Sequence, residues 1–224
     1  MGLHRLGAAC LWGARMTSIA RSELILGGQR SGKSRRAEIL ARQWLAQSGE
    51  HRAVMIATGQ PWDDEMAARI VQHQADRAER VPGMTTVEEP LALSEALALN
   101  SQPHTLVVVD CLTLWLTNLL MPVQTAQDDF SNNFESNQPP ALDLTARTAM
   151  LLVAIKKTPG PIVFVGNEIG LGVIPMGRDT RAFVDALGRL NQDVAAACQR
   201  VTFMAAGLPL VLKGAPLNDG CSGC

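Results

Sequence analysis

The stretch Leu24-Ile25-Leu26-Gly27-Gly28-Gln29-Arg30-Ser31-Gly32-Lys33-Ser34 joins a short apolar run to a segment of helix-forming composition. From Gly27 to Ser34 it fits G-x-x-x-x-G-K-[ST], a pattern whose glycines let backbone N–H groups surround a phosphate at a helix N-terminus. Lys33 is placed to reach the β- and γ-phosphates, and the Ser34 hydroxyl to coordinate Mg²⁺. The residues predicted to bind a nucleoside triphosphate are therefore Gly27, Gly28, Gln29, Arg30, Ser31, Gly32, Lys33 and Ser34.

A second acidic element is expected at the end of another buried strand, and Leu106-Val107-Val108-Val109-Asp110 provides it. An aspartate after a strand often only caps the next helix, and Asp110 could do so here. Beside a phosphate loop, a Mg²⁺ ligand or a water-mediated contact to the ion is the favoured role.

Apolar runs of strand length recur along the chain, with helix-compatible segments between them. The predicted strands are Leu24–Leu26, Val54–Ala57, Leu106–Val109, Ile162–Val165 and, less clearly, Pro209–Leu212. The predicted helices are Lys33–Gln47, Asp63–Arg80, Pro90–Leu99, Leu112–Met121, Leu142–Lys157 and Thr180–Gln199. Continuous apolar runs suit strands that are covered on both faces. The sequence thus predicts a single α/β domain of the P-loop NTPase type, with three layers and a mainly parallel sheet.

The predicted domain spans residues 21–213. Residues 1–20 are expected to be an N-terminal extension, and residues 214–224 a flexible C-terminal tail. The polar segment Pro122–Pro140 is predicted to be a long surface loop within the domain.

Composition excludes several classes of protein. The 224 residues are 47% apolar and 18% charged, which rules out a disordered or collagen-like chain. A net charge of −1 and 4% aromatic residues argue against nucleic acid as a partner, and no apolar stretch is long enough for a membrane span. Five scattered cysteines indicate reduced thiols and a cytoplasmic location; they are Cys10, Cys111, Cys198, Cys221 and Cys224. The terminal pair Cys221 and Cys224 is interpreted as incidental.

Four motifs, in order, carry a resemblance to a known family. They are the loop Gly27–Ser34, then I-A-T-G with D-D-E-M and R-I-V-Q-H-Q-A-D-R in Ile56–Arg77, D-C-L-T with T-N-L-L in Asp110–Leu120, and G-N-E-I-G-L-G-V-I-P with R-L-N-Q in Gly166–Gln192. Together they resemble the bifunctional adenosylcobinamide kinase/adenosylcobinamide-phosphate guanylyltransferase family of cobalamin biosynthesis. Two features depart from its pattern: Ala78 replaces the usual proline, and Pro122–Pro140 is longer and more polar than expected.

The resemblance implies two reactions. ATP or GTP phosphorylates the aminopropanol hydroxyl of adenosylcobinamide, and GTP then transfers GMP to adenosylcobinamide phosphate through a guanylyl-histidine, with release of pyrophosphate. It also implies Mg²⁺ as cofactor and a homo-oligomer, a trimer in the family. The nucleotide contacts that it adds are Ala57, Thr58, Gly59, Arg77 and Glu88, with Asp110 and Ser34 at the metal. Nothing in the sequence decides between ATP and GTP for the kinase step.

The resemblance makes His73 the nucleophile that carries GMP, with Lys33 as the second catalytic residue. On a helix, Arg69, His73 and Arg77 fall at i, i+4 and i+8 and so share one stripe. A neutral imidazole can attack an α-phosphorus, and flanking guanidiniums would stabilise the charge that develops. Without the resemblance, a solvated polar helix face is the simpler interpretation.

Two other functions stay open at this point. One is a corrinoid kinase without transferase activity, which a His73 buried away from the nucleotide would indicate. The other is a regulatory P-loop protein that uses the loop as a nucleotide-dependent switch. Asn167 and Glu168 either shape the mouth of the site or only form a glycine-rich turn.

Overall fold

The computed structural model describes residues 19–121 and 140–215 of the chain. The first 18 residues, nearly all of the Pro122–Pro140 segment and residues 216–224 lie outside this range, and with them His4, Cys10, Cys221 and Cys224. The predicted roles of the extension, the loop and the tail therefore stay predictions. Ile19, just inside the described part, already packs against the core.

The chain alternates strands and helices from its first element. The strands are β1 (Ser22–Gly27), β2 (Arg52–Ala57), β3 (Met84–Glu88), β4 (Thr105–Asp110), β5 (Ile162–Asn167), β6 (Arg200–Ala205) and β7 (Leu208–Lys213). The helices are α1 (Lys33–Leu45), α2 (Asp64–Arg80), α3 (Leu93–Asn100), α4 (Leu112–Leu120), α5 (Pro140–Lys157) and α6 (Arg178–Ala197).

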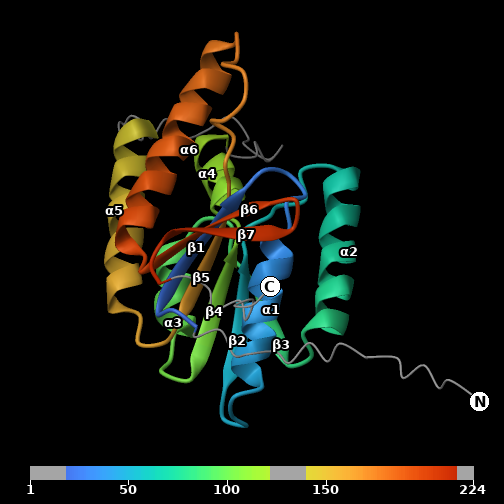
Figure 1. Ribbon diagram of the computed structural model, residues 1–224. Coiled ribbons are helices and arrows are strands. Elements are labelled where there is room, and N and C mark those ends of the chain that lie inside the picture. Colours follow the sequence, from blue (N-terminus) through green and yellow to red (C-terminus); the bar gives the residue numbers. More distant parts are fainter. Residues whose placement is uncertain (1–18, 122–139, 216–224) are drawn as a thin grey trace, which may run out of the picture.

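One sheet runs through the molecule in the order β3-β2-β4-β5-β1-β6-β7 (Figure 1). The first six strands in this order are parallel to their neighbours, and β7 pairs antiparallel with β6. Helices α3 to α6 cover one face, whereas α1 and α2 lie on the other side (Figure 1). The predicted three-layer α/β fold with a mainly parallel sheet is confirmed.

Alternate residues of the central strands enter two separate apolar cores. In β1, Leu24 and Leu26 join the core under α3 to α6, whereas Ile25 joins the core under α1. β4 and β5 follow the same alternation, with Val, Ile and Phe in the first core and Leu and Val in the second. Because both faces are covered, the strands are apolar throughout, and this is why the sequence reveals them.

Two strands were not predicted, and both are partly polar. β3 has the sequence M-T-T-V-E and lies at the sheet edge, where three of its five side chains are exposed. The strand contains the Thr85-Thr86 pair and Glu88. β6 carries Arg200 and Thr202, which are buried although polar. Neither strand has the continuous apolar run by which the inner strands were recognised.

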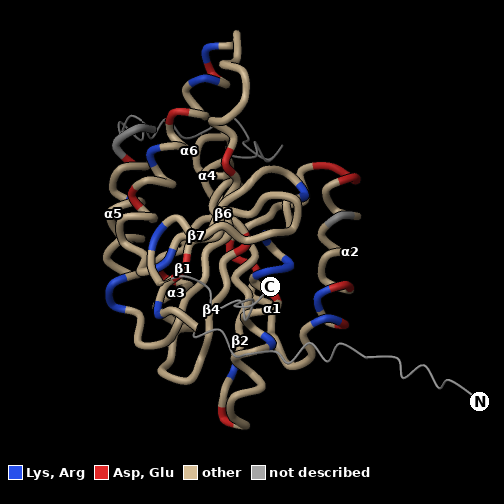
Figure 2. The backbone as a smooth tube through the Cα atoms, viewed as in Figure 1, with Lys and Arg blue, Asp and Glu red and all other residues tan. Residues whose placement is uncertain are grey.

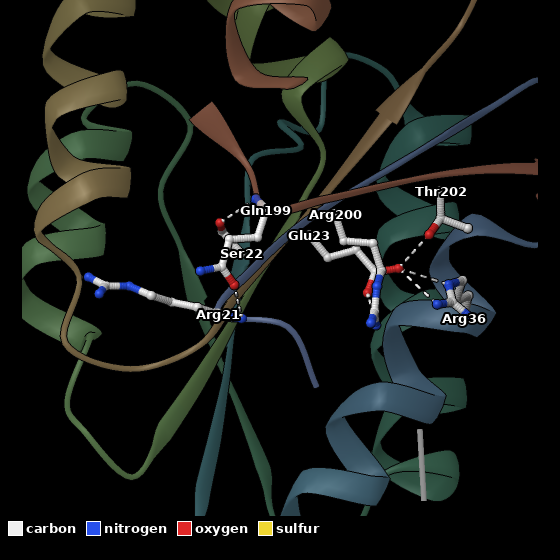
Figure 3. A network of polar contacts seen from close by, with 7 residues as sticks. All are labelled: Arg21, Ser22, Glu23, Arg36, Gln199, Arg200 and Thr202. Atoms are coloured by element: carbon white, nitrogen blue, oxygen red, sulfur yellow. Dashed lines mark hydrogen bonds and ion pairs between the residues drawn. The ribbon is translucent and has the colours of Figure 1, made fainter. Parts of the chain in front are cut away.

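The polar residues of β6 surround a buried carboxylate on β1 (Figure 3). Glu23 is 1% exposed, and its Oε1 accepts hydrogen bonds from Arg36 Nε and Nη2 at 3.1 and 2.8 Å. The hydroxyl of Thr202 donates to the same oxygen at 2.8 Å, and Arg200 Nη1 lies 3.6 Å from Glu23 Oε2. The network ties α1 to β1 and β6 through Arg36, which follows Lys33 by three residues.

We predict that Glu23→Ala destabilises the protein by about 3–5 kcal/mol, because it leaves buried guanidiniums without their carboxylate. Urea unfolding measures this free energy. The matched control is Asp143→Ala, which removes the acid of an exposed pair with Arg147 and should cost under about 1 kcal/mol. Equal losses in the two variants would contradict the structural role given to Glu23.

Candidate active site

The phosphate loop has the backbone that its glycines allow. Gly27 and Gly32 have φ angles of 154° and 101°, and Arg30 has a φ of 55°. Gly32 is the N-cap of α1, whose first turn contains no acidic residue. The free N–H groups and the dipole at this helix start favour a bound anion.

The hairpin between β6 and β7 packs against this loop. A Cβ on Gly27 would lie 2.5 Å from the Met204 carbonyl oxygen, and one on Gly32 would lie 3.2 Å from Gly207 Cα. The Gly207 N–H donates to the Ser31 carbonyl oxygen at 3.0 Å. The loop glycines thus serve close packing as well as the phosphate geometry for which the sequence analysis assigned them. The hairpin was missed because its contact with the loop joins residues far apart in sequence.

Lys33 lies beneath the loop and is 8% exposed. Its Nζ donates to the Gly28 carbonyl oxygen at 2.6 Å. Burial lowers the pKa of Lys33, and the nearby Cys111 and Asp110 oppose this effect. Because Asp110 is close enough to act on Lys33, the lysine and the acid predicted from separate motifs share one site.

Asp110 ends β4 and is half-buried. Strand β5 lies between β4 and β1, so Asp110 and the phosphate loop occupy the same carboxyl edge of the sheet. The alternative in which Asp110 caps the next helix is wrong, because Cys111 is the N-cap of α4. Burial raises the pKa of the Cys111 thiol to about 12, so this sulfur is not a thiolate at neutral pH.

Thr58 is fully buried and joins the ends of β2 and β4. Its hydroxyl donates to the Cys111 carbonyl oxygen at 2.7 Å and accepts from the Cys111 N–H at 2.9 Å. Its own carbonyl oxygen accepts from Asn118 Nδ2 at 2.7 Å. The side chain therefore positions the Asp110–Cys111 segment. Its neighbours Ala57 and Gly59, predicted with it as nucleotide contacts, are half-exposed.

Helix α2 carries Arg69, His73 and Arg77 on one continuous helix, as the sequence predicts. His73 is exposed. Arg77 Nη1 donates to Thr86 Oγ1 on β3 at 3.3 Å, and Gln74 Nε2 donates to Glu88 Oε1 at 2.7 Å. The first turn of α2 is acidic, whereas its last turns mix the basic Arg77 and Arg80 with acidic residues (Figure 2). Arg77 and Glu88, which the sequence analysis assigned to the nucleotide, are thus brought to the contact between α2 and β3.

Asn167 and Glu168 lie where β5 ends beside the phosphate loop. Asn167 pairs with Gly27 in register, and the Glu168 N–H donates to the Gly27 carbonyl oxygen at 3.1 Å. From α6, Asn191 Nδ2 donates to the Asn167 carbonyl oxygen at 3.1 Å. These contacts place the two backbones beside the phosphate loop, and a role of the side chains at the mouth of the site stays a prediction. Asn191 belongs to the R-L-N-Q motif, which received no role from sequence.

His51 and His104 immediately precede β2 and β4, at the opposite edge of the sheet from the phosphate loop. Their rings lie 6.0 Å apart, and His51 stacks on Trp44. Both histidines thus lie at the edge of the sheet away from the phosphate loop.

A sequence model of the family described as cobinamide kinase / cobinamide phosphate guanyltransferase matches residues 23–212. The chain belongs to this family. The match spans every motif of the site, from the phosphate loop to R-L-N-Q. The predicted enzyme class, a kinase and guanylyltransferase of cobalamin biosynthesis that uses nucleotide substrates, agrees with the family's description and is confirmed.

Individual relatives cover nearly the whole of their own length. The bifunctional adenosylcobalamin biosynthesis protein CobP of Pseudomonas aeruginosa is 46% identical over 195 residues, which is 87% of this chain and 99% of that protein. The bifunctional adenosylcobalamin biosynthesis protein CobU of Escherichia coli is 35% identical over 190 residues, or 85% and 98% of the two chains. Among solved structures, the flagellar accessory protein FlaH of Methanocaldococcus jannaschii has a TM-score of 0.45 and 10% identity, over 88% of this chain and 80% of that one. At that score the likeness says nothing about function.

Across residues 19–121 and 140–215, no helix combines the length and the apolar character that a membrane crossing requires.

We predict that Thr58→Val destabilises the protein by about 1–3 kcal/mol, because it leaves the buried N–H of Cys111 without its partner and removes one of the two hydrogen bonds to the Cys111 carbonyl oxygen, which keeps the Trp115 N–H. Thr117→Val is the control: Thr117 donates only to the Thr113 carbonyl within α4, and the substitution is isosteric there. Urea unfolding compares the two variants. A Thr58→Val protein as stable as Thr117→Val would show that the clamp between β2 and β4 does not depend on this hydroxyl.

Proposed function

We propose that the candidate site carries out both family reactions, in sequence, on a corrinoid acceptor. In the first, the aminopropanol hydroxyl of adenosylcobinamide attacks the γ-phosphorus of ATP or GTP, loses its proton and releases the nucleoside diphosphate. In the second, His73 attacks the α-phosphorus of GTP, and pyrophosphate leaves. The phosphate of adenosylcobinamide phosphate then attacks the guanylyl phosphorus, breaks the phosphorus–nitrogen bond and restores His73, giving adenosylcobinamide-GDP.

The observation that supports the kinase step is that Asp110 ends β4 at the same carboxyl edge of the sheet as the phosphate loop, near enough for its charge to act on the Lys33 ammonium. Lys33 Nζ donates to the Gly28 carbonyl oxygen. When it donates instead to a phosphate oxygen, it contacts the β- or γ-phosphate. Its ammonium would then offset the negative charge of the transferring group.

Mg²⁺ fits the same place. It prefers oxygen ligands and binds proteins through one or two groups, with phosphates and water completing the shell. The Ser34 hydroxyl and the Asp110 carboxylate are of this kind, and we assign them to the ion. When bound, Mg²⁺ neutralises charge on the β- and γ-phosphates.

The transferase step rests on His73. Its exposure on α2 leaves the imidazole open to a nucleotide, and this favours the bifunctional enzyme over a kinase alone. Arg77 lies one turn further along the helix, where it can stabilise the charge on the α-phosphate. The other proposed nucleotide contacts are Ala57, Thr58, Gly59 and Glu88. Because the Thr58 side chain is buried, it contributes by positioning its neighbours.

A cytoplasmic location and a homo-oligomer, a trimer by resemblance, belong to the same proposal. Exposed apolar side chains along β7, namely Leu208, Leu210 and Leu212, support self-association. Light scattering on the purified protein measures the number of chains.

We predict that Lys33→Ala lowers both activities about 10²- to 10³-fold without unfolding the protein, since one preorganised charge is lost from each transition state. Phosphorylation of cobinamide and transfer of GMP are measured separately with radiolabelled nucleotide. Near-normal cobinamide phosphorylation would contradict the role of the phosphate loop.

We predict that His73→Asn abolishes covalent labelling of the enzyme by α-³²P-GTP and abolishes the GDP-linked product, while the kinase step persists at least in part. The kinase step needs no enzyme-bound intermediate, because the acceptor hydroxyl attacks the γ-phosphorus directly. The wild-type label should be labile in acid and stable in base, as a phosphorus–nitrogen bond is. His104→Asn, at the opposite edge of the sheet, is the matched control and should label normally. Labelling of His73→Asn would move the nucleophile elsewhere, and nucleotide retained by the wild type without covalent label would favour a switch protein.

A further inference from the structure

A cleft of about 530 Å³ lies between the segment that follows β5 and the first half of α6. From the segment, its walls include Ile169, Val173 and Ile174, and from the helix, Gly188, Arg189 and Gln192. Arg181 holds the two walls together, because its Nη1 donates to the Pro175 and Met176 carbonyl oxygens at 3.0 and 2.6 Å. In Figure 1 the first half of α6, in orange, rises beyond the carboxyl ends of the strands. The cleft therefore lies at the carboxyl edge of the sheet, where the phosphate loop also lies.

Both walls start next to the phosphate loop. On one side, Ile169 directly follows Glu168, whose N–H bonds to the Gly27 carbonyl oxygen. On the other side, Gln192 directly follows Asn191, whose amide bonds to the Asn167 carbonyl oxygen. A molecule in the cleft would thus reach toward bound nucleotide from the side of β5.

The lining combines apolar and polar groups. Val173 and Ile174 are 96% and 76% exposed, which is unusual for aliphatic side chains in a folded chain. The charged residues of the lining are two arginines, Arg181 and Arg189, and a single acid, Asp185. This surface suits a ligand that has an apolar periphery, hydrogen-bonding groups and a negative charge at one stage of its reaction.

Gly188 is independent evidence that the cleft is left open. It lies inside α6, where glycine is about 1 kcal/mol less favourable than alanine. A Cβ built on Gly188 meets no atom within 4 Å, so packing within the described chain does not require glycine. The missing side chain leaves the floor of the cleft open.

We propose that this cleft binds the corrinoid acceptor, with its methyl- and amide-bearing edge against Val173 and Ile174 and its phosphate, once formed, near Arg189. The proposal rests on the proposed function, because it takes the corrinoid as the acceptor of both transfers. The macrocycle is larger than the cleft, so the cleft holds one edge and directs the aminopropanol arm toward Gly27 and the nucleotide.

A second cleft, of about 580 Å³ between α3 and α5, is the main competitor among the described residues. Its lining surface is mostly apolar and includes no arginine, with Glu95 and Lys157 as its charged members. None of its lining residues belongs to the phosphate loop or to the residues proposed to bind nucleotide. A second copy of the chain is the other possible cover for the exposed aliphatic side chains.

The test fills the cleft. Gly188→Leu adds bulk where the backbone leaves room, and Gly49→Leu is the matched control, because a Cβ on Gly49 also meets no atom within 4 Å, at a turn before β2. Arg189→Ala removes the charge without adding bulk. Binding of cobinamide is measured by equilibrium dialysis through its visible absorbance, and α-³²P-GTP labelling of the enzyme is measured without corrinoid.

We expect Gly188→Leu to weaken cobinamide binding at least tenfold, and Arg189→Ala to raise the KM for cobinamide phosphate more than that for cobinamide. Gly49→Leu should bind as the wild type does. All three variants should take up the GTP label normally, because that half-reaction does not involve the cleft.

The outcomes separate the two proposals. If the wild type labels and binds cobinamide but Gly188→Leu binds it equally well, the cleft is not the corrinoid site. If binding falls only together with a changed oligomeric state in light scattering, a second copy occupies the cleft and the proposal is overturned. If the wild type neither labels nor binds cobinamide, the proposed function fails, and the assignment of the cleft fails with it.

Discussion

Three segments meet at Gly27, and the site depends on the absence of a side chain there. On one side the Met204 carbonyl of β6 would lie 2.5 Å from a Cβ, and on the other the Glu168 N–H donates to the Gly27 carbonyl. Any larger residue would push β6 or the phosphate loop away. Since the loop, the segment after β5 and the β6–β7 hairpin all meet at this residue, the proposed positions of nucleotide and acceptor both depend on the end of β1.

Buried polar groups hold this arrangement from below. Glu23 binds Arg36 of α1 and Arg200 of β6, so the helix that presents Lys33 is fixed to two strands. Thr58 similarly bonds the end of β2 to the peptide that follows Asp110. Removing one member of such a network leaves a desolvated partner, which makes these positions sensitive to substitution although none is proposed to touch the reacting atoms.

The two proposed reactions make different demands on the fold. Phosphoryl transfer uses Lys33 and Asp110, which the sheet and α1 hold firmly. Guanylyl transfer would use His73 on α2, a helix that contains no buried residue among those described and that is joined to β3 by exposed hydrogen bonds. One fixed phosphate site beside a lightly held helix would allow GTP to be attacked at either of two phosphorus atoms.

The sequence by itself determined the phosphate loop, the inner strands, most helices and the family, because each depends on neighbouring residues or on apolar runs covered on both faces. Only the tertiary structure revealed β3 and β6. The polar residues of β3 are tolerated because the strand lies at the sheet edge, and those of β6 because Arg200 and Thr202 contact Glu23. It also brought Asp110 to Lys33, gave Thr58 a positioning role and formed the cleft beside α6. The contacts of β6, Asp110 and Thr58 depend on parallel pairing between segments more than fifty residues apart, and such pairing leaves no local pattern in the sequence.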